Sequence, residues 1–444
     1  MSSAAAEVEP VVRPRPDHPI SRSEISENTL KVLYRLHKTG YKAYLCGGGV
    51  RDLMLGRRPK DFDVATDARP EDIRRVFRNS RVIGRRFRLV HVFFRGEIVE
   101  VSTFRREPDP DEQEGEDEAL LITSDNTWGS PRQDAFRRDF TVNALFYDIA
   151  DFSVIDYVGG LADLDRQVIR AIGDPDVRFQ EDPVRMLRAC EFAGRLGFRI
   201  EPATQEAVGR QRRELDKASP ARLTEELIQL LRCGHAGRAF QWLHDLGLME
   251  VLLPEAYAMV TAGERGLGDF GRVLPAVDGL IAEGRELADT ALLAALLLPS
   301  VLLRRLDVEA LDSRPMTRAA LAELVAEVVA PLFERFTISR DRATRVERAL
   351  TGFLRLCEPG WGAAERVRFA RRPFFDDAST LFEIMTRATG EGAEALAAWR
   401  RAAAKAGRDR REQGDEGEQG GEAAARPRRR RRSGRGRRRR RGGG

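Results

Sequence analysis

Residues 45–66 read LCGGGVRDLMLGRRPKDFDVAT, in which three consecutive glycines are followed by an Arg-Asp pair. Glycine lacks Cβ and tolerates positive φ, so a glycine turn lets the backbone come close to phosphate groups. The residues after the turn predict a helix over 50–55, and the N-terminus of a helix favours an anion. We therefore predict that Gly47, Gly48 and Arg51 hold the triphosphate of a nucleotide.

Two carboxylates follow in the segment DFDVAT. Asp61 and Asp63 are two residues apart, and in an extended strand over 61–66 their side chains point the same way. Like charges held side by side repel each other unless a cation lies between them, and oxygen ligands suit Mg²⁺. The alternative is a solvated turn in which both aspartates cap neighbouring helices. The glycine turn nearby favours the metal site.

A third carboxylate comes from the segment EIVEVSTF over 97–104. Glu100 lies in the middle of this predicted strand among apolar neighbours, where a charge is costly unless it is paired or bound to a metal. Glu97 is a weaker candidate, because it starts the strand beside Gly96. We expect Glu100 to complete the metal site. The alternative is that it points outward from an edge strand.

The composition indicates a multidomain cytoplasmic protein. A chain of 444 residues is long enough for two or three domains. Neither a membrane span nor secretion is expected, since no apolar run approaches roughly 18 residues and the N-terminus lacks an apolar signal core. The cysteines are widely spaced and are expected to be reduced thiols.

The net charge of +5 is unevenly distributed. Residues 426–444 contain twelve arginines and no acid, and subtracting these leaves −7 for residues 1–425. A disordered basic tail of this kind binds phosphate chains without sequence preference, by displacing counterions. An acidic stretch within 106–131 predicts a long irregular loop.

The hydrophobic pattern predicts an α+β fold. Helices over 25–38, 50–55 and 70–78 alternate with strands over 41–46 and 61–66, and a hairpin follows around Arg95-Gly96. Leu- and Ala-rich amphipathic helices continue to residue 400. We expect a small mixed-sheet head followed by an all-helical neck and body, with disordered termini. The expected boundaries are 1–24 for a flexible N-terminal arm, 25–155 for the head, 156–255 for the neck, 256–400 for the body and 401–444 for a disordered Arg-rich tail.

Two further segments carry charged groups at informative positions. In DAFRRDFTVNALFYDI, over 134–149, Asp139 precedes an apolar run and could be a helix N-cap. In EDPVRMLRACEFAGRLGF, over 181–198, Asp182 fits an N-cap before Pro183. Arg185 and Arg188 share a face away from the apolar stripe, as in a helix with exposed arginines. A guanidinium and a carboxylate can also imitate a pairing base, because they present donors and acceptors at fixed angles.

Together, GGGVRDLMLG, DFDVAT, RRDFTVNALFYD, DYVGGLADL and EDPVRMLRA resemble the class II nucleotidyltransferases, which include CCA-adding enzymes and bacterial poly(A) polymerases of the DNA polymerase beta superfamily. The resemblance spans about 45–200. It implies that Asp139 lies near the ribose and Arg138 near the phosphates. It also implies that Asp182 and Arg185 read the base, assisted by Arg188. The segment SPARLTEEL at 219–227 fits an SxxRxxxEL pattern of the same enzymes.

Among these enzymes the chain most resembles a bacterial poly(A) polymerase, because GRRFRLVHV at 84–92 resembles their signature, whereas CCA-adding relatives carry something nearer GxxFGT. The resemblance implies template-independent addition of AMP from ATP to RNA 3′ ends. Asp61, Asp63 and Glu100 would hold two Mg²⁺ ions, with Asp139 as a further catalytic candidate. The expected partners are ATP, RNA 3′ ends and possible RNA-decay proteins. The alternatives are a CCA-adding tRNA nucleotidyltransferase and a non-catalytic RNA-binding adaptor.

Overall fold

The computed structural model describes residues 9–84, 88–106, 127–261, 264–311 and 316–422. The head contains an eight-stranded mixed sheet in the order β1-β8-β7-β2-β3-β6-β5-β4, in which β3 and β6 pair in parallel and the other neighbours pair antiparallel. The expected mixed sheet is therefore confirmed. The strands are β1 (Val11–Arg13), β2 (Ala43–Cys46), β3 (Asp63–Thr66), β4 (Ser80–Ile83), β5 (Leu89–Phe94), β6 (Glu97–Thr103), β7 (Leu145–Asp148) and β8 (Val154–Asp156).

Successive side chains of the central strands enter two different apolar cores, as the two-residue period of a strand requires. Leu45 of β2 belongs to the main core, whereas its neighbours Tyr44 and Cys46 belong to a smaller core on the other face. Val64 and Ala65 of β3 divide in the same way. The main core also takes the buried stripe of a helix capped by Ser26. The helices of the head are α1 (Glu27–Lys38), α2 (Gly48–Met54), α3 (Pro70–Val76) and α4 (Pro131–Arg137).

The N-terminal arm differs from its expected flexibility. Residues Val11–Arg13 form β1, which pairs with β8, and Ile20 is fully buried. His18 Nε2 lies 2.8 Å from the carbonyl oxygen of Phe152. The expectation of a flexible arm up to residue 24 is therefore wrong for these residues. This strand could not be predicted from the hydrophobic pattern, because β1 is held by backbone pairing with β8 and the side chain of Val11 is exposed.

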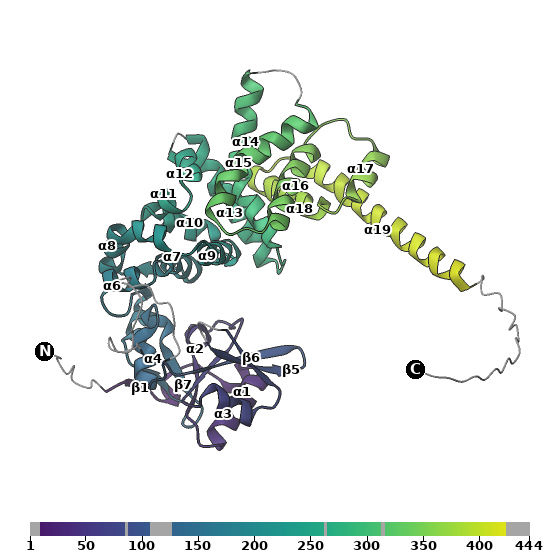
Figure 1. The fold of residues 1–444 in the computed structure, drawn as a ribbon. Coiled ribbons are helices and arrows are strands. Elements are labelled where there is room, and N and C mark those ends of the chain that lie inside the picture. The colour runs from purple at the N-terminus through teal and green to yellow at the C-terminus, as the bar shows by residue number, and fades with distance from the viewer. Residues whose placement is uncertain (1–8, 85–87, 107–126, 262–263, 312–315, 423–444) are drawn as a thin grey trace, which may run out of the picture.

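The neck and the body are helical, apart from one short parallel pair of strands, β9 (Val168–Ile169) and β10 (Arg199–Ile200). Head, neck and body follow one another along a curved path (Figure 1). The neck helices are α5 (Gly160–Arg166), α6 (Pro175–Glu181), α7 (Val184–Leu196), α8 (Pro202–Gln211), α9 (Pro220–Arg232), α10 (Ala236–Asp245), α11 (Leu248–Leu252) and α12 (Pro254–Thr261).

The body ends in a long helix that projects from it (Figure 1). The body helices are α13 (Glu264–Ala282), α14 (Asp289–Leu311), α15 (Arg318–Arg335), α16 (Arg340–Leu356), α17 (Ala363–Ala370), α18 (Phe375–Thr389) and α19 (Ala393–Glu422). Because α19 runs to Glu422, the first half of the expected disordered tail is helical, and the arginine run after it lies outside the described residues. The low-complexity composition predicted disorder, but the Ala, Glu and Arg residues of this segment are also strong helix formers.

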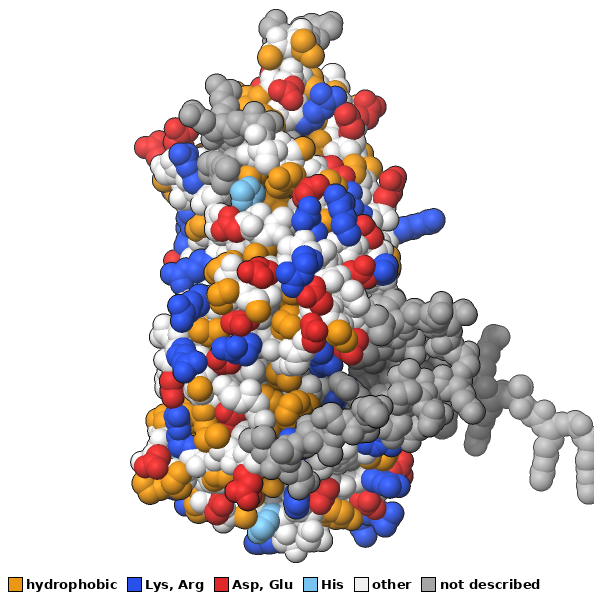
Figure 2. All heavy atoms as spheres, turned by 90° about the vertical axis from the view of Figure 1, so that its left-hand side faces the viewer, with side chains coloured by type: hydrophobic (Ala, Val, Ile, Leu, Met, Phe, Trp, Pro, Cys, Tyr) orange, Lys and Arg blue, Asp and Glu red, His pale blue; other side chains and the backbone are white. Residues whose placement is uncertain are grey.

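The described surface is mixed in charge. Figure 2 shows basic, acidic and apolar side chains interspersed over one face of the molecule. In the described ranges, no helix combines the length and the apolar character needed to cross a bilayer.

Candidate active site

The glycine turn lies between β2 and α2. Gly47 has φ +69°, and its N–H donates to the carbonyl oxygen of Leu145 at 3.1 Å. A Cβ at Gly47 would lie 3.0 Å from Nη1 of Arg138, and one at Gly48 would lie 3.4 Å from Nη2 of Arg51. Gly47 is therefore favoured for two reasons, its positive φ and the close approach of the Arg138 guanidinium, whereas a Cβ at Gly48 would make only an ordinary contact. Binding of phosphate by Gly47 and Gly48 stays a prediction.

Arg51 points into the protein rather than into an open pocket. Its side chain is 2% exposed, and Nη1 donates to Oδ1 of Asn143 at 2.5 Å. It also pairs with Asp52 and lies 5.4 Å from the ring centroid of Phe192. Arg51 is therefore buried under the glycine turn and paired with Asn143 and Asp52. To contact a phosphate, its side chain would have to leave these two partners.

Arg138 has a similar supporting position. Its guanidinium donates to Oδ2 of Asp134 and to the carbonyl oxygen of Asn143, and it packs over the ring of Phe146 at 5.2 Å. Burial opposes its charge, but Cys46 and Asp134 more than offset this, so the pKa of Arg138 is raised and the group stays ionised. Arg138 therefore holds a fixed positive charge directly behind Gly47.

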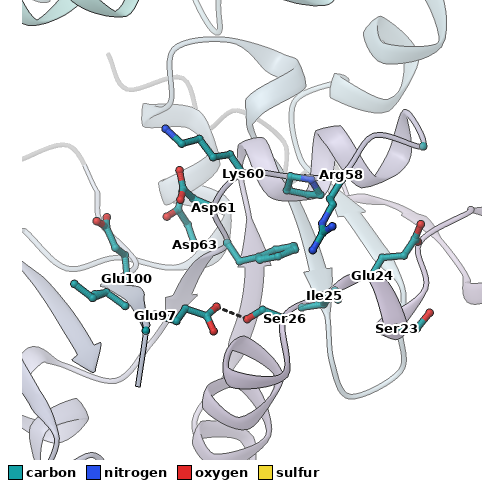
Figure 3. A pocket seen from close by; sticks show the side chains of 15 residues that line it. Ser23, Glu24, Ile25, Ser26, Arg58, Lys60, Asp61, Asp63, Glu97 and Glu100 are labelled. Atoms are coloured by element: carbon teal, nitrogen blue, oxygen red, sulfur yellow. Dashed lines mark hydrogen bonds between the residues drawn. The ribbon is translucent and has the colours of Figure 1, made fainter. Parts of the chain in front are cut away.

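The predicted carboxylates line one pocket of about 1000 Å³ in the head (Figure 3). Figure 3 shows the carboxylates of Asp61 and Asp63 next to each other, with Glu100 rising from the neighbouring strand. Asp63 and Glu100 are register partners across the parallel pair β3 and β6. Glu100, 37 positions after Asp63 in sequence, thus lines the same pocket as the two aspartates. The remaining lining includes Ser23, Glu24, Ile25, Ser26, Arg58, Pro59, Lys60, Glu97 and Ile98.

The acids are electrostatically coupled. The pKa of Asp63 is raised to about 6, because the surrounding protein displaces water and because Glu100 and Asp61 add negative charge, while Arg138 opposes the rise. Glu100 lies 3.3 Å from Nε2 of His91. Glu97 is engaged elsewhere, since it accepts hydrogen bonds from Ser26 and Asn28 at 2.5 and 2.6 Å at the start of α1.

The acids suit Mg²⁺ in chemistry, although the described residues contain no group of three His, Cys, Asp or Glu side chains arranged to hold one ion. The expected three-carboxylate cluster is therefore not assembled in this arrangement. Mg²⁺ usually takes only one or two carboxylates and completes its shell with waters and substrate phosphates. Asp61 and Asp63 fit that need in number and chemistry. The pKa of Asp63 is raised first by desolvation and then by the negative charge of Glu100 and Asp61, which a cation would offset.

A second polar cluster links the head to the neck. Asp139 Oδ2 accepts from Nε of Arg188 at 2.8 Å, and Oδ1 accepts from Nδ2 of Asn143 at 3.2 Å. Burial alone would raise the pKa of Asp139, but the charge and hydrogen bonds of Arg188 and the bond from Asn143 outweigh it, so the pKa is lowered. Asp139 is therefore an ionised acceptor that is paired with Arg188 of the neck. The N-cap alternative is wrong, because no helix of the described chain begins directly after Asp139.

Asp182 and Arg185 lie near each other but bind other partners. Both oxygens of Asp182 accept from Arg222, and Nε of Arg185 lies 4.0 Å from Asp182. Arg185 is 8% exposed and donates to Glu181 and to the carbonyl oxygen of Arg178. The alternative of a helix with exposed arginines therefore does not hold for Arg185, which is buried. The expected N-cap is wrong, because Asp182 pairs with Arg222 of α9 and Pro183 occupies the N-cap position of α7.

Two family models match separate segments of this chain. Residues 43–170 match the family model described as Poly A polymerase head domain, and residues 197–259 match the one described as Probable RNA and SrmB-binding site of polymerase A. Residues 43–170 of this chain are therefore similar to the head domain of the poly(A) polymerase family. The resemblance inferred from the sequence is confirmed.

Relatives of two kinds share this nucleotidyltransferase head. Poly(A) polymerase I of Salmonella typhi is 52% identical over 56% of this chain and 55% of its own length, and that of Escherichia coli O6:H1 is 49% identical over 62% and 59%. The CCA-adding enzyme of Lactobacillus gasseri is 37% identical over 51% and 55%. The chain thus matches little more than half the length of these relatives.

Among solved structures, the Bacillus stearothermophilus CCA-adding enzyme in complex with CTP has a TM-score of 0.62, with 24% identity over 87% of this chain and 83% of its own. The Thermotoga maritima CCA-adding enzyme complexed with tRNA has a TM-score of 0.56 and 20% identity, over 89% and 86%. At these identities the likeness shows a common fold from head to body.

Sequence reasoning missed the residues that position the predicted ones. Asn143 contacts Arg51, Asp139 and Arg138, and it lies inside an apolar run, VNALF, where a buried amide needs partners. Arg222 was noted only as part of a pattern, although it holds Asp182. Parts of two other predictions, the GRRFRLVHV string at 85–87 and the acidic stretch at 107–126, lie outside the described residues.

Proposed function

We propose that this protein is a poly(A) polymerase that transfers AMP from ATP to RNA 3′ ends without a template and releases pyrophosphate. The observation that carries the proposal is the 40–52% identity to poly(A) polymerases I over 257–283 residues. The CCA-adding relatives are 37–38% identical over 225–227 residues.

In this proposal the pocket acids hold magnesium. Asp61 and Asp63 provide oxygen ligands on the floor of the pocket, and Glu100 faces them from the adjoining strand. When bound, Mg²⁺ would supply the charge that lowers the pKa of a 3′-hydroxyl and offsets charge on the leaving pyrophosphate. His91, the register partner of Glu100 on β5, lies within 3.3 Å of that carboxylate.

The neck residues would hold the nucleotide. Asp182 is fixed by two hydrogen bonds from Arg222, and Arg185 is fixed by Glu181. Planar groups held this firmly can discriminate among bases, because an ill-matched base leaves buried donors or acceptors unpaired. Arg188, oriented by Asp139, would assist in binding the nucleotide.

A second candidate is a CCA-adding tRNA nucleotidyltransferase. It is favoured by the 37% identity to the Lactobacillus gasseri enzyme over the same head and by the fold shared with CCA-adding enzymes. The two activities would use the same carboxylates, so the residues of the pocket do not distinguish one activity from the other. The nucleotide that is incorporated and the length of the product do distinguish them.

The test is primer extension with purified protein and Mg²⁺, supplying each nucleoside triphosphate separately to a generic RNA and to a tRNA lacking its 3′ end. Long A tracts on the generic RNA are expected. Addition that stops after C, C and A on the tRNA would establish the second candidate. Asp61→Ala should abolish incorporation, whereas Glu71→Ala, an exposed acid on α3, should not. Incorporation by Asp61→Ala, or RNA binding without any incorporation by the wild type, contradicts the proposed chemistry.

A further inference from the structure

The pocket that contains the acids also has two basic residues on its wall. Arg58 and Lys60 come from the loop between α2 and β3, and both line the pocket together with Asp61 and Asp63 (Figure 3). Both side chains are exposed. Within the described residues, neither takes part in an ion pair or a side-chain hydrogen bond. Two cations that are unpaired within the described ranges therefore line the same pocket as the carboxylates.

The loop that carries these cations is anchored on both sides. Gly56 turns the chain with φ +65°, and Pro59, between the two cations, is buried. The neighbouring Arg57 points the other way and donates to the carbonyl oxygens of Arg195 and Leu196 at the end of α7, at 3.4 and 3.3 Å. Arg58 and Lys60 thus belong to a loop that the side chain of Arg57 ties to the neck.

The charges in the pocket explain why cations are needed there. The lining contains the five carboxylates of Glu24, Asp61, Asp63, Glu97 and Glu100, but only two cations. A phosphate group approaching this surface is repelled unless positive charge is close to it. Arg51, predicted from the glycine turn to hold phosphate, and Arg138, placed near the phosphates by the family resemblance, already have protein partners and lie outside the lining.

We propose that Lys60 and Arg58 bind phosphate groups of the substrates at this pocket. The inference rests on the proposed function, since it takes the reacting molecules to be a nucleoside triphosphate and an RNA end. Both carry the phosphate oxygens that an ammonium and a guanidinium recognise. Residues of the neck that would read the base are absent from the described lining, so the pocket is suited to phosphate rather than to the base.

The test compares charge reversal at the pocket with the same change elsewhere on the head. Lys60→Glu and Arg58→Glu are matched to Lys42→Glu, an exposed lysine just before β2, at the end of the strand pair away from Asp63. Incorporation of ATP into an oligo(A) primer gives KM for ATP at saturating primer and KM for primer at saturating ATP. Fluorescence anisotropy of labelled primer and calorimetry with ATP measure binding without turnover.

Lys60→Glu is expected to raise one KM about tenfold with kcat little changed, because a charge-assisted contact to phosphate is lost and a repulsion is added. Lys60→Arg should restore it, and Lys42→Glu should leave both KM values unchanged. A raised KM for ATP identifies the triphosphate as the bound group. A raised KM for primer, with a salt slope smaller by about one, identifies the RNA strand.

Unchanged KM values and unchanged binding in both Lys60→Glu and Arg58→Glu would overturn the proposal. Should charge reversal prevent folding, judged by circular dichroism, Lys60→Gln and Arg58→Gln take its place. A wild type that binds primer and ATP but incorporates nothing refutes the proposed function alone. The anisotropy and calorimetry of the variants then still decide whether these cations bind phosphate.

Discussion

Asn143→Ala is the most informative single change, because this side-chain amide joins Arg51 of α2 to Asp139. It is 7% exposed, its Oδ1 accepts from Arg51 at 2.5 Å, and its Nδ2 donates to Asp139 at 3.2 Å. Each of these hydrogen bonds has a charged partner and contributes roughly 1.5–3 kcal/mol. Truncation leaves Arg51 buried with only Asp52 beside it, so we expect a loss of about 3–5 kcal/mol of unfolding free energy.

The measurement is urea unfolding followed by circular dichroism, with the m-value as a check that the same transition is compared. Asn79→Ala is the control, because this exposed asparagine makes one side-chain hydrogen bond, to the carbonyl oxygen of Phe93. It should cost no more than about 1 kcal/mol. A loss below about 1 kcal/mol for Asn143→Ala would show that Arg51 does not depend on the amide, and our account of the buried turn would be refuted.

Asn143→Asp separates the two hydrogen bonds. An ionised carboxylate can still accept from Arg51, but it has no donor for Asp139 and places a like charge 3.2 Å from it. We expect Asn143→Asp to fold better than Asn143→Ala while raising KM for the nucleotide, since the repulsion disturbs Asp139 and through it Arg188. Equal KM values for wild type and Asn143→Asp would contradict this role of Asp139.

Further predictions concern charge and fit. The pKa of Glu226 is raised to about 7 by burial, against the opposing charges of Arg188 and Arg222. Its ionisation therefore opposes folding at high pH, so Glu226→Gln should be about 1–3 kcal/mol more stable than wild type at pH 8 and equal to it near pH 4.5, as measured by urea unfolding. The double change Asp61→Asn with Asp63→Asn should raise the melting temperature without Mg²⁺ and abolish the further rise that Mg²⁺ gives the wild type. Gly47→Ala should cost at least about 1 kcal/mol, because φ is +69° and its Cβ would meet Arg138; a smaller loss in thermal denaturation would mean that the turn relaxes. Arg222→Ala should weaken discrimination between ATP and CTP in single-nucleotide incorporation, whereas unchanged discrimination would separate Asp182 from base recognition.

The elements that could be predicted from the sequence are those that depend on residues close together in the chain. Alternating apolar residues identified β2, β3 and the β5–β6 hairpin, and the glycines and carboxylates around them gave the pocket. The partner of each charged group could not be read in this way. Asp182 meets Arg222, forty positions away, only because α7 and α9 pack together. A charge run looks the same in sequence whether it faces solvent, as at Lys60, or the interior, as at Arg51.

The ion pair between Asp139 and Arg188 is one of several contacts between the neck and the head. The ring of Phe140 packs edge-on against Phe192 of α7, with centroids 5.8 Å apart. Arg178 of α6 donates to the carbonyl oxygens of Arg137 and Arg138 at 2.7 and 3.1 Å. These three contacts reach the segment 137–140, which lies shortly before Asn143 in sequence. If the neck residues read the base and the head acids hold the metal, as we propose, these contacts hold the two groups in a fixed relation before the nucleotide binds.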